Sequence, residues 1–184
     1  MIIAVIGLSG CGKSEVVNYL LKKGNFFRVY FGDVTFDEMK RRNLKINENN
    51  ERQIREEIRA RYGMGAYAKL SLPKIHKLVQ KGKDVLIESL YSWEEYLVIK
   101  DNYPETVFLA VYASPKTRYQ RLSGRKDRPL NPEEAESRDH AQIENLHQAG
   151  PITMADYTLI NESSLKNLHN QIEGAMKEIY AQEK

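Results

Sequence analysis

The segment Gly7–Ser14, which reads GLSGCGKS, constrains the fold of this chain more than any other. Its glycine spacing, followed by lysine and serine, is typical of a loop whose backbone N–H groups turn inward around a phosphate. Such a loop binds phosphate when a strand precedes it and a helix follows it, because the helix N-terminus adds its positive dipole end. The β-branched run Ile2–Ile6 comes before the loop, and residues 15–23 have helical apolar spacing. The sequence therefore predicts a strand, a phosphate loop and a helix in that order.

The segment Leu8–Cys11 also fits a different pattern, the cleavage box of a bacterial lipoprotein signal. That pattern requires a basic residue and then a longer apolar stretch before the box, and the chain offers only the apolar run Ile2–Ile6. No run of residues approaches the roughly 18 apolar positions that cross a bilayer. We therefore expect Cys11 to be a small residue of the phosphate loop, and we expect no membrane partner.

Length and composition indicate one soluble domain. The chain has 184 residues, of which 41% are apolar and 29% are charged. A net charge of +3 favours local anion sites over a surface that coats nucleic acid, so we expect no nucleic-acid partner. The single cysteine excludes an internal disulfide and favours a reducing, cytoplasmic location.

The remaining pattern alternates strands with helices, which is typical of a parallel sheet covered on both faces. Besides the first strand and helix, we expect strands at 26–31, 84–88, 106–112 and 156–160. Further helices are expected at 34–44, 47–62, 65–80, 93–103, 114–122 and 163–180. The predicted fold class is a three-layer α/β P-loop NTPase fold with a five-stranded parallel sheet. Two polar segments, near 34–64 and 124–150, look like excursions from this core, and the second offers few core residues.

Two further features fit a site for a nucleotide and a metal ion. Glu88 closes the apolar strand "DVLIE", where a carboxylate could ligate Mg²⁺ near the loop, although it could also cap the next helix. A basic cluster within eleven positions could close over a transferring phosphoryl group, or could be a solvated surface: Arg118, Arg121, Arg125, Lys126 and Arg128.

These segments together resemble the adenylate-kinase-like P-loop nucleotide kinases, including small prokaryotic relatives of adenylate kinase and dephospho-CoA kinase. The resemblance covers nearly the whole chain, and four segments carry it: "GLSGCGKS" (7–14), "FGD" (31–33), "TRYQRLSGR" (117–125) and "ADYTLINESSL" (155–165). It implies a single kinase domain over 1–184 with a core of 1–32, 65–123 and 151–184. The two excursions would then be an acceptor-binding helical insertion at about 33–64 and a lid at about 124–150.

The same resemblance implies the site residues and the cofactors, ATP and Mg²⁺. The residues expected to bind ATP are Gly7, Leu8, Ser9, Gly10, Cys11, Gly12, Lys13, Ser14, Glu15, Arg121, Asn161 and Ser163. The residues expected to act in catalysis are Lys13, Arg121, Arg125, Asp33 and Glu88, with Ser14 and Glu88 as metal ligands. Arg128 and Arg138 are further candidates on the lid.

The acceptor side departs from the family pattern. Phe36 and Tyr91 stand where the family carries arginines that grip the phosphate of the acceptor, and Arg41, Arg42 or an arginine of the 51–61 helix could replace them. The expected function is transfer of the γ-phosphoryl group of Mg·ATP to a nucleotide-like acceptor, of the nucleoside monophosphate or dephospho-CoA type. The alternatives are a nucleoside kinase that uses Asp33 as general base, suggested by a weak resemblance of "ESLYSWEEY" (88–96) to deoxynucleoside kinases, and a non-catalytic nucleotide-binding switch. We expect a monomer or a weak homodimer.

Overall fold

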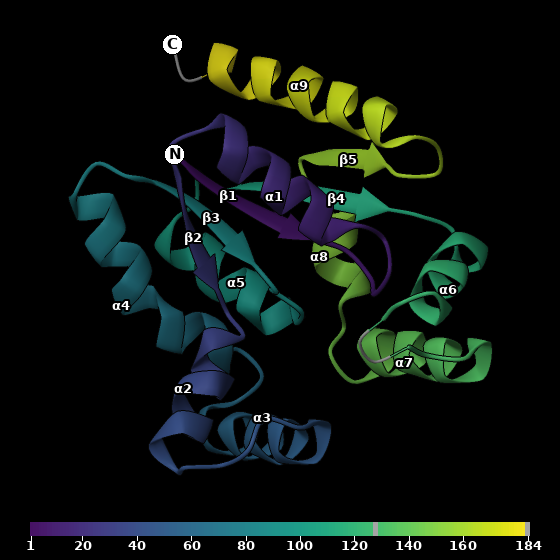
Figure 1. Cartoon of the computed structure of the whole chain (residues 1–184). Coiled ribbons are helices and arrows are strands. Elements are labelled where there is room, and N and C mark those ends of the chain that lie inside the picture. Colours follow the sequence, from purple (N-terminus) through teal and green to yellow (C-terminus); the bar gives the residue numbers. More distant parts are fainter. Residues whose placement is uncertain (127–128, 183–184) are drawn as a thin grey trace.

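A parallel sheet with the strand order β2-β3-β1-β4-β5 forms the centre of the molecule (Figure 1). The computed structural model describes residues 1–126 and 129–182. The strands are β1 (Ile2–Ile6), β2 (Phe26–Tyr30), β3 (Asp84–Glu88), β4 (Val107–Tyr112) and β5 (Tyr157–Ile160). The predicted α/β fold with five parallel strands is confirmed within the described residues.

The seven predicted helices are confirmed, with ends shifted by a few residues, and two further helices lie between 132 and 153, outside the predicted helix ranges. The helices are α1 (Lys13–Lys23), α2 (Asp33–Arg41), α3 (Glu48–Tyr62), α4 (Ala66–Gln80), α5 (Trp93–Asn102), α6 (Pro115–Ser123), α7 (Pro132–Glu144), α8 (Ala149–Thr153) and α9 (Leu165–Gln182). None of the helices in the described ranges is long and apolar enough to cross a membrane.

The central strand β1 has every side chain buried, so its two faces supply both cores of the molecule. Ile3 and Val5 pack with residues of α1 and α9 on one face. Ile2, Ala4 and Ile6 pack with residues of α4 and α5 on the other. The register aligns Val5 with Glu88 of β3 and Ile6 with Ala110 of β4. Because the strands are parallel, the loop after β1 and the carboxylate of Glu88 reach the same edge of the sheet.

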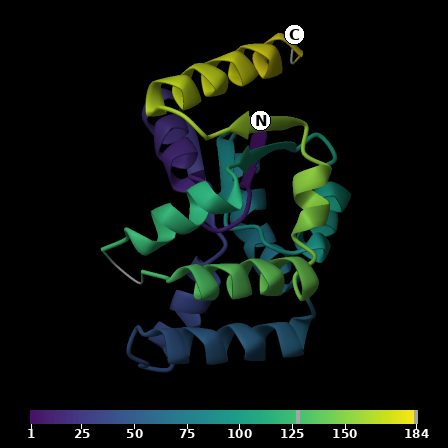
Figure 2. The ribbon, with the colours of Figure 1, turned by 90° about the vertical axis from the view of Figure 1, so that its right-hand side faces the viewer.

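Two helices face each other beyond this edge. Helix α3 lies below the sheet, and α7 runs alongside α3 without touching its ribbon (Figure 2). Asn131 caps the start of helix α7. Its side chain accepts a hydrogen bond from the backbone N–H of Glu134 at 2.8 Å, and the Glu134 carboxylate accepts one from the backbone N–H of Asn131. These reciprocal bonds and Pro132 at the first helical position explain why the chain turns helical there.

Helix α7 packs on the core, although the sequence indicated few core residues between 124 and 150. Arg118 of α6 and Asp139 of α7 form a buried ion pair with Nη1–Oδ1 and Nη2–Oδ2 distances of 2.7 and 2.5 Å. Arg118 also donates to the carbonyl oxygens of Ala113 (3.0 Å) and Ser9 (3.2 Å), and Tyr119 donates to Asp139 at 3.0 Å. The second half of the expected lid is therefore held against α6 and the phosphate loop.

Candidate functional site

The loop between β1 and α1 has a backbone that only glycine adopts easily. Gly10 and Gly12 have φ angles of 82° and 103°. A Cβ atom on Gly12 would lie 2.2 Å from Nδ2 of Asn161, and one on Gly10 would lie 2.8 Å from the carbonyl oxygen of Arg118. The Asn161 amide donates to the carbonyl oxygen of Cys11 at 2.8 Å, so the end of β5 holds the loop in this form. The close packing of the loop against Asn161 and Arg118 thus depends on these glycines.

Lys13 closes the loop on itself. Its Nζ donates to the carbonyl oxygens of Gly7 at 2.7 Å and Leu8 at 3.0 Å. Arg121 lies beside the loop, where Nη2 donates to the carbonyl oxygen of Asn161 at 2.9 Å while the buried Nη1 has no partner. A buried guanidinium nitrogen without an acceptor is expensive to maintain, and a phosphate oxygen would satisfy it. These residues therefore fit a polyphosphate at the loop.

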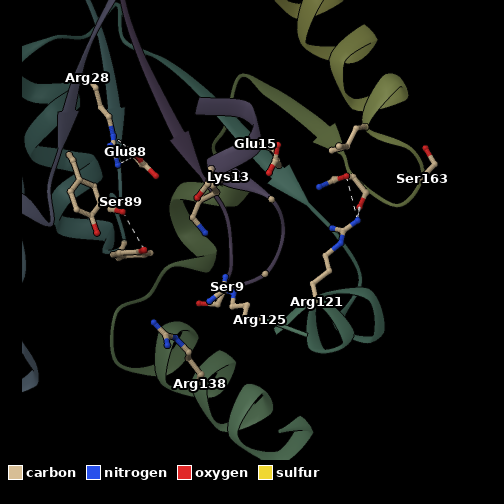
Figure 3. A pocket seen from close by; sticks show the side chains of 17 residues that line it. Ser9, Lys13, Glu15, Arg28, Glu88, Ser89, Arg121, Arg125, Arg138 and Ser163 are labelled. Atoms are coloured by element: carbon tan, nitrogen blue, oxygen red, sulfur yellow. Dashed lines mark hydrogen bonds and ion pairs between the residues drawn. The ribbon is translucent and has the colours of Figure 1, made fainter. Parts of the chain in front are cut away.

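An open cavity of about 760 Å³ lies against the loop, with charged side chains around it (Figure 3). Most of the predicted site residues line it: Ser9, Gly10, Gly12, Lys13, Ser14, Glu15, Glu88, Arg121, Arg125, Asn161 and Ser163. Gly7, Leu8 and Cys11 belong to the loop but do not line the cavity; Cys11 is buried in the core. Arg138 reaches this cavity from α7. Arg128 lies outside the described residues.

Glu88 and Ser14 line the same cavity. This pair of oxygen-bearing side chains suits a magnesium ion, because Mg²⁺ is usually held by few protein oxygens together with substrate phosphates. Arg28 on β2 bonds Oε2 of Glu88 through Nε and Nη2, each at 2.6 Å (Figure 3). Across residues 1–126 and 129–182, no group of three or more His, Cys, Asp or Glu side chains could hold a metal ion. Arg28 was not among the residues identified from sequence, although it is the one charged residue of the strand FFRVY.

The structure places Asp33 away from the loop. It is the first residue of α2, and its exposed carboxylate receives a hydrogen bond from Nζ of Lys74 at 3.0 Å. Asp33 lines neither the cavity at the loop nor the neighbouring cavity described next. The expected role of Asp33 at the acceptor therefore receives no support from its position.

A second cavity of about 690 Å³ lies between α3 and α7 and adjoins the first. The two cavities share four lining residues, Tyr30, Ser89, Tyr91 and Arg138. Ser89, at the junction where the two cavities meet, has a φ of 68°. This left-handed backbone conformation is costly for serine. Three arginines of α3 line the second cavity: Arg52, Arg55 and Arg59. By contrast, Arg41 and Arg42, two other candidates for the acceptor, bond Glu38 and lie outside the cavity.

A chain of buried amides connects the two cavities. Gln142 of α7, which lines the second cavity, accepts bonds from the backbone N–H of Ser9 at 3.3 Å and from its hydroxyl at 3.0 Å. The Gln142 amide donates to Gln148 at 2.7 Å, and the Gln148 amide donates to the carbonyl oxygen of Gly7 at 3.0 Å. Helix α7 is thereby tied to the phosphate loop through side chains whose roles the sequence pattern did not reveal.

Glu95, at the start of α5, is a buried carboxyl group near the arginines of α3. Its Oε2 accepts from the backbone N–H groups of Tyr91 (2.7 Å) and Ser92 (3.2 Å), while Oε1 is buried without a partner. Burial raises the pKa of Glu95 to about 7, against the lowering effects of these backbone bonds and of the charge of Arg59; Glu94 adds a smaller raising effect. Glu95 is therefore largely protonated in the folded protein below neutral pH.

Stability is expected to fall as pH rises through the range where Glu95 ionises. An unfolded glutamate loses its proton near pH 4.5, whereas the folded one retains it to about pH 7, so raising the pH between these values favours unfolding. The Glu95→Gln variant keeps an acceptor for the two N–H groups and cannot ionise. We expect the free energy of unfolding of the variant, minus that of the wild type, to be roughly 3 kcal/mol larger at pH 8 than at pH 4.5. Urea unfolding at the two pH values measures this difference. Equal pH dependence in the two proteins would refute this assignment.

Known proteins resemble this chain in sequence. Residues 3–143 match the AAA_18 family, described as an AAA domain. A UPF0200 protein of Thermococcus sibiricus is 34% identical over 177 residues, which are 94% of this chain and 92% of the relative. Another, from Sulfurisphaera tokodaii, is 34% identical over 182 residues, 97% of each chain. This chain belongs to the UPF0200 family and carries an AAA domain.

Solved structures resemble the UPF0200 chain over nearly its full length. A dephospho-CoA kinase from Campylobacter jejuni has a TM-score of 0.62 and 16% identity, covering 100% of this chain and 98% of the other. A shikimate kinase from Bacteroides thetaiotaomicron has a TM-score of 0.61 and 13% identity, with 98% of each chain covered. A gluconokinase from Sinorhizobium meliloti 1021 has a TM-score of 0.56 and 10% identity, covering 99% and 97%. At these identities the likeness shows a kinase-like P-loop fold.

Proposed function

We propose that this UPF0200 protein is an ATP-dependent phosphotransferase that moves the γ-phosphoryl group of Mg·ATP to a nucleotide-like acceptor. The observation that carries the proposal is the meeting of two cavities at one edge of the sheet. One contains the phosphate loop, and the other is lined by arginine and aromatic side chains, with four residues common to both. A protein that only bound ATP would have no need of the second cavity, whereas phosphoryl transfer requires a donor and an acceptor in line.

The residues of the first cavity have distinct roles in this proposal. The loop amides and Lys13 hold the phosphates, and Ser14 and Glu88 are the protein ligands of Mg²⁺, which neutralises phosphate charge when bound. Arg121 and Arg125 stabilise the charge on the phosphoryl group during transfer. Asn161 and Ser163 border the adenine. Because Lys13 bonds two loop carbonyl groups in this structure, it must turn toward the phosphates when ATP binds.

The solved structures with the same fold support this class of reaction, since their names are those of kinases for different small molecules. The nucleoside-kinase alternative assigns the general base to Asp33, but Asp33 does not line either cavity. The non-catalytic switch does not account for the second cavity. Phosphotransfer is therefore the function that the geometry supports best.

The test is ADP release from Mg·ATP, measured alone and with each member of a panel of small acceptors: nucleoside monophosphates, the matching nucleosides and dephospho-CoA. We expect at least one acceptor to stimulate ADP release well above the rate with ATP alone and to acquire the label of γ-³²P-ATP. Micromolar ATP binding with no stimulation by any acceptor would instead support the switch.

A further inference from the structure

We propose that the second cavity holds a phosphate monoester through Arg59 and Arg138, and that this phosphate receives the γ-phosphoryl group. This inference rests on the proposed function and specifies the chemical class of its acceptor. Three observations support it: the ion pairs that the arginines of the cavity form, the positions of the arginines, and the residues that line both cavities.

The arginines of the second cavity fall into two sets. Arg52 bonds Glu56 at 2.8 Å, and Arg55 bonds Glu48 at 2.7 Å and Glu51 at 3.4 Å. Their charges are thus compensated by acids of the same helix. Within the part of the chain that the structure describes, Arg59 and Arg138 form no ion pair with a carboxylate. These two guanidinium groups are the ones that can accept a new anion.

Arg59 is positioned by its surroundings. Its guanidinium lies 5.1 Å from the ring centroid of Tyr67, and its Nε is buried without a hydrogen-bond partner. Tyr67 is itself fixed by a 2.7 Å bond between its hydroxyl and that of Thr35. A cation–π contact restricts where an arginine side chain lies, and its planar fork of N–H groups suits the oxygens of a phosphate.

Arg138 lines the second cavity from α7, whereas Arg59 lines it from α3. Arg138 is also one of the four residues that line both cavities (Figure 3). A group bound by Arg138 therefore lies between the phosphate loop and the α3 wall. Phe36 and Tyr91, which replace the arginines of the resembled kinases, also line the second cavity and leave its anion-binding capacity to α3 and α7.

Among the described residues, none of the four that line both cavities carries a carboxylate that could serve as base. Besides Arg138, these four are Tyr30, Ser89 and Tyr91, and the nearby Glu88 is bonded twice by Arg28. The acids of the second cavity are on α3, where they bond Arg52 and Arg55. A hydroxyl acceptor needs a base to remove its proton, but a phosphate oxygen is already ionised at neutral pH.

The reaction then balances without a proton transfer. An ionised oxygen of the acceptor phosphate attacks the γ-phosphorus of ATP. The bond between that phosphorus and the β–γ bridging oxygen breaks, and ADP leaves with the electron pair. The product carries a new phosphoanhydride bond, so a monophosphate becomes a diphosphate.

Binding and turnover together test the inference. We would titrate the wild type, saturated with Mg²⁺ and a non-hydrolysable ATP analogue, with AMP, CMP, GMP and UMP and with the four matching nucleosides. At least one monophosphate should bind ten- to a hundredfold more tightly than its nucleoside. Arg59→Met and Arg138→Met should each remove about tenfold or more of that preference while leaving nucleoside binding nearly unchanged. Arg59→Met should also leave analogue affinity nearly unchanged, because Arg59 does not line the cavity at the loop. Arg61→Met is the matched control, because Arg61 is on α3 but does not line the cavity.

The outcomes separate this inference from the proposed function. Equal affinity for nucleosides and monophosphates, unchanged preference in both arginine variants, or ATP-dependent phosphorylation of a hydroxyl would overturn the phosphate-acceptor inference while leaving phosphotransfer intact. Selective monophosphate binding that depends on both arginines, with no ADP release, would support the anion site and count against the proposed function.

Discussion

Replacing Lys13 with methionine should lower acceptor-dependent ADP release by about 10²- to 10³-fold, the usual consequence of losing a donor that stabilises charge in the transition state. Methionine has a similar length and an unbranched side chain, so packing around the loop should change little. Lys13 is the cation of the loop itself, and its ammonium group already lies 2.7 Å from the oxygen of Gly7. Within residues 1–126 and 129–182, no other lysine lines the first cavity. The measurement is the initial rate at saturating Mg·ATP and acceptor.

Lys22→Met is the control for this experiment, since Lys22 lies on the same helix, is exposed and does not line the cavity. The control should keep its rate, and both variants should unfold at urea concentrations close to that of the wild type. A Lys13→Met protein that retains its rate within a few-fold would mean that the loop lysine does not act on the transferred group.

The second large effect concerns the attachment of α7. Asp139→Ala should reduce the free energy of unfolding by about 3–5 kcal/mol, because it leaves the buried guanidinium of Arg118 without its carboxylate. The Tyr119 hydroxyl loses its acceptor as well. Since α7 carries Arg138 and Gln142, its loosening should also weaken acceptor binding. Urea unfolding at neutral pH measures the first effect.

Glu136→Ala provides the comparison, because Glu136 is exposed on the same helix and should change stability by no more than about 0.5 kcal/mol. The double variant Arg118→Met/Asp139→Leu should recover part of the loss, since it removes both buried charges at once. A loss below about 1 kcal/mol in Asp139→Ala would show that the ion pair does not hold α7 in place.

The residues predicted to bind ATP mostly come together at one cavity, and the strongest signal for them is local in the sequence. The loop motif, the strand before it and the helix after it are contiguous, and strand order in a parallel sheet brings Glu88 and Asn161 to the same edge. The basic cluster and the resemblance both indicated Arg121 and Arg125, and the resemblance alone indicated Ser163; all three line the cavity at the loop. These positions depend on fold topology more than on the details of packing.

The second cavity was harder to predict because its contacts join distant residues. Gln142 meets Ser9 across 133 positions, and Gln148 meets Gly7 across 141. Buried amides have no hydrophobic periodicity, so the sequence pattern indicates few core residues at 124–150 although Asp139 and Gln142 are buried. Asp33 shows the converse limit: a match to the motif "FGD" gave its place in the chain, but its carboxylate accepts a hydrogen bond from Lys74 and lines neither cavity.

The central claim is that the loop after β1 binds the polyphosphate of a nucleotide. Calorimetric titration of the wild-type protein with the non-hydrolysable analogue AMP-PNP in the presence of magnesium tests it most directly. We predict one binding site per chain with a micromolar dissociation constant, weakened in Lys13→Met and unchanged in Lys22→Met. No binding heat for the wild type with either millimolar AMP-PNP or the corresponding millimolar guanine analogue, GMP-PNP, would contradict the account.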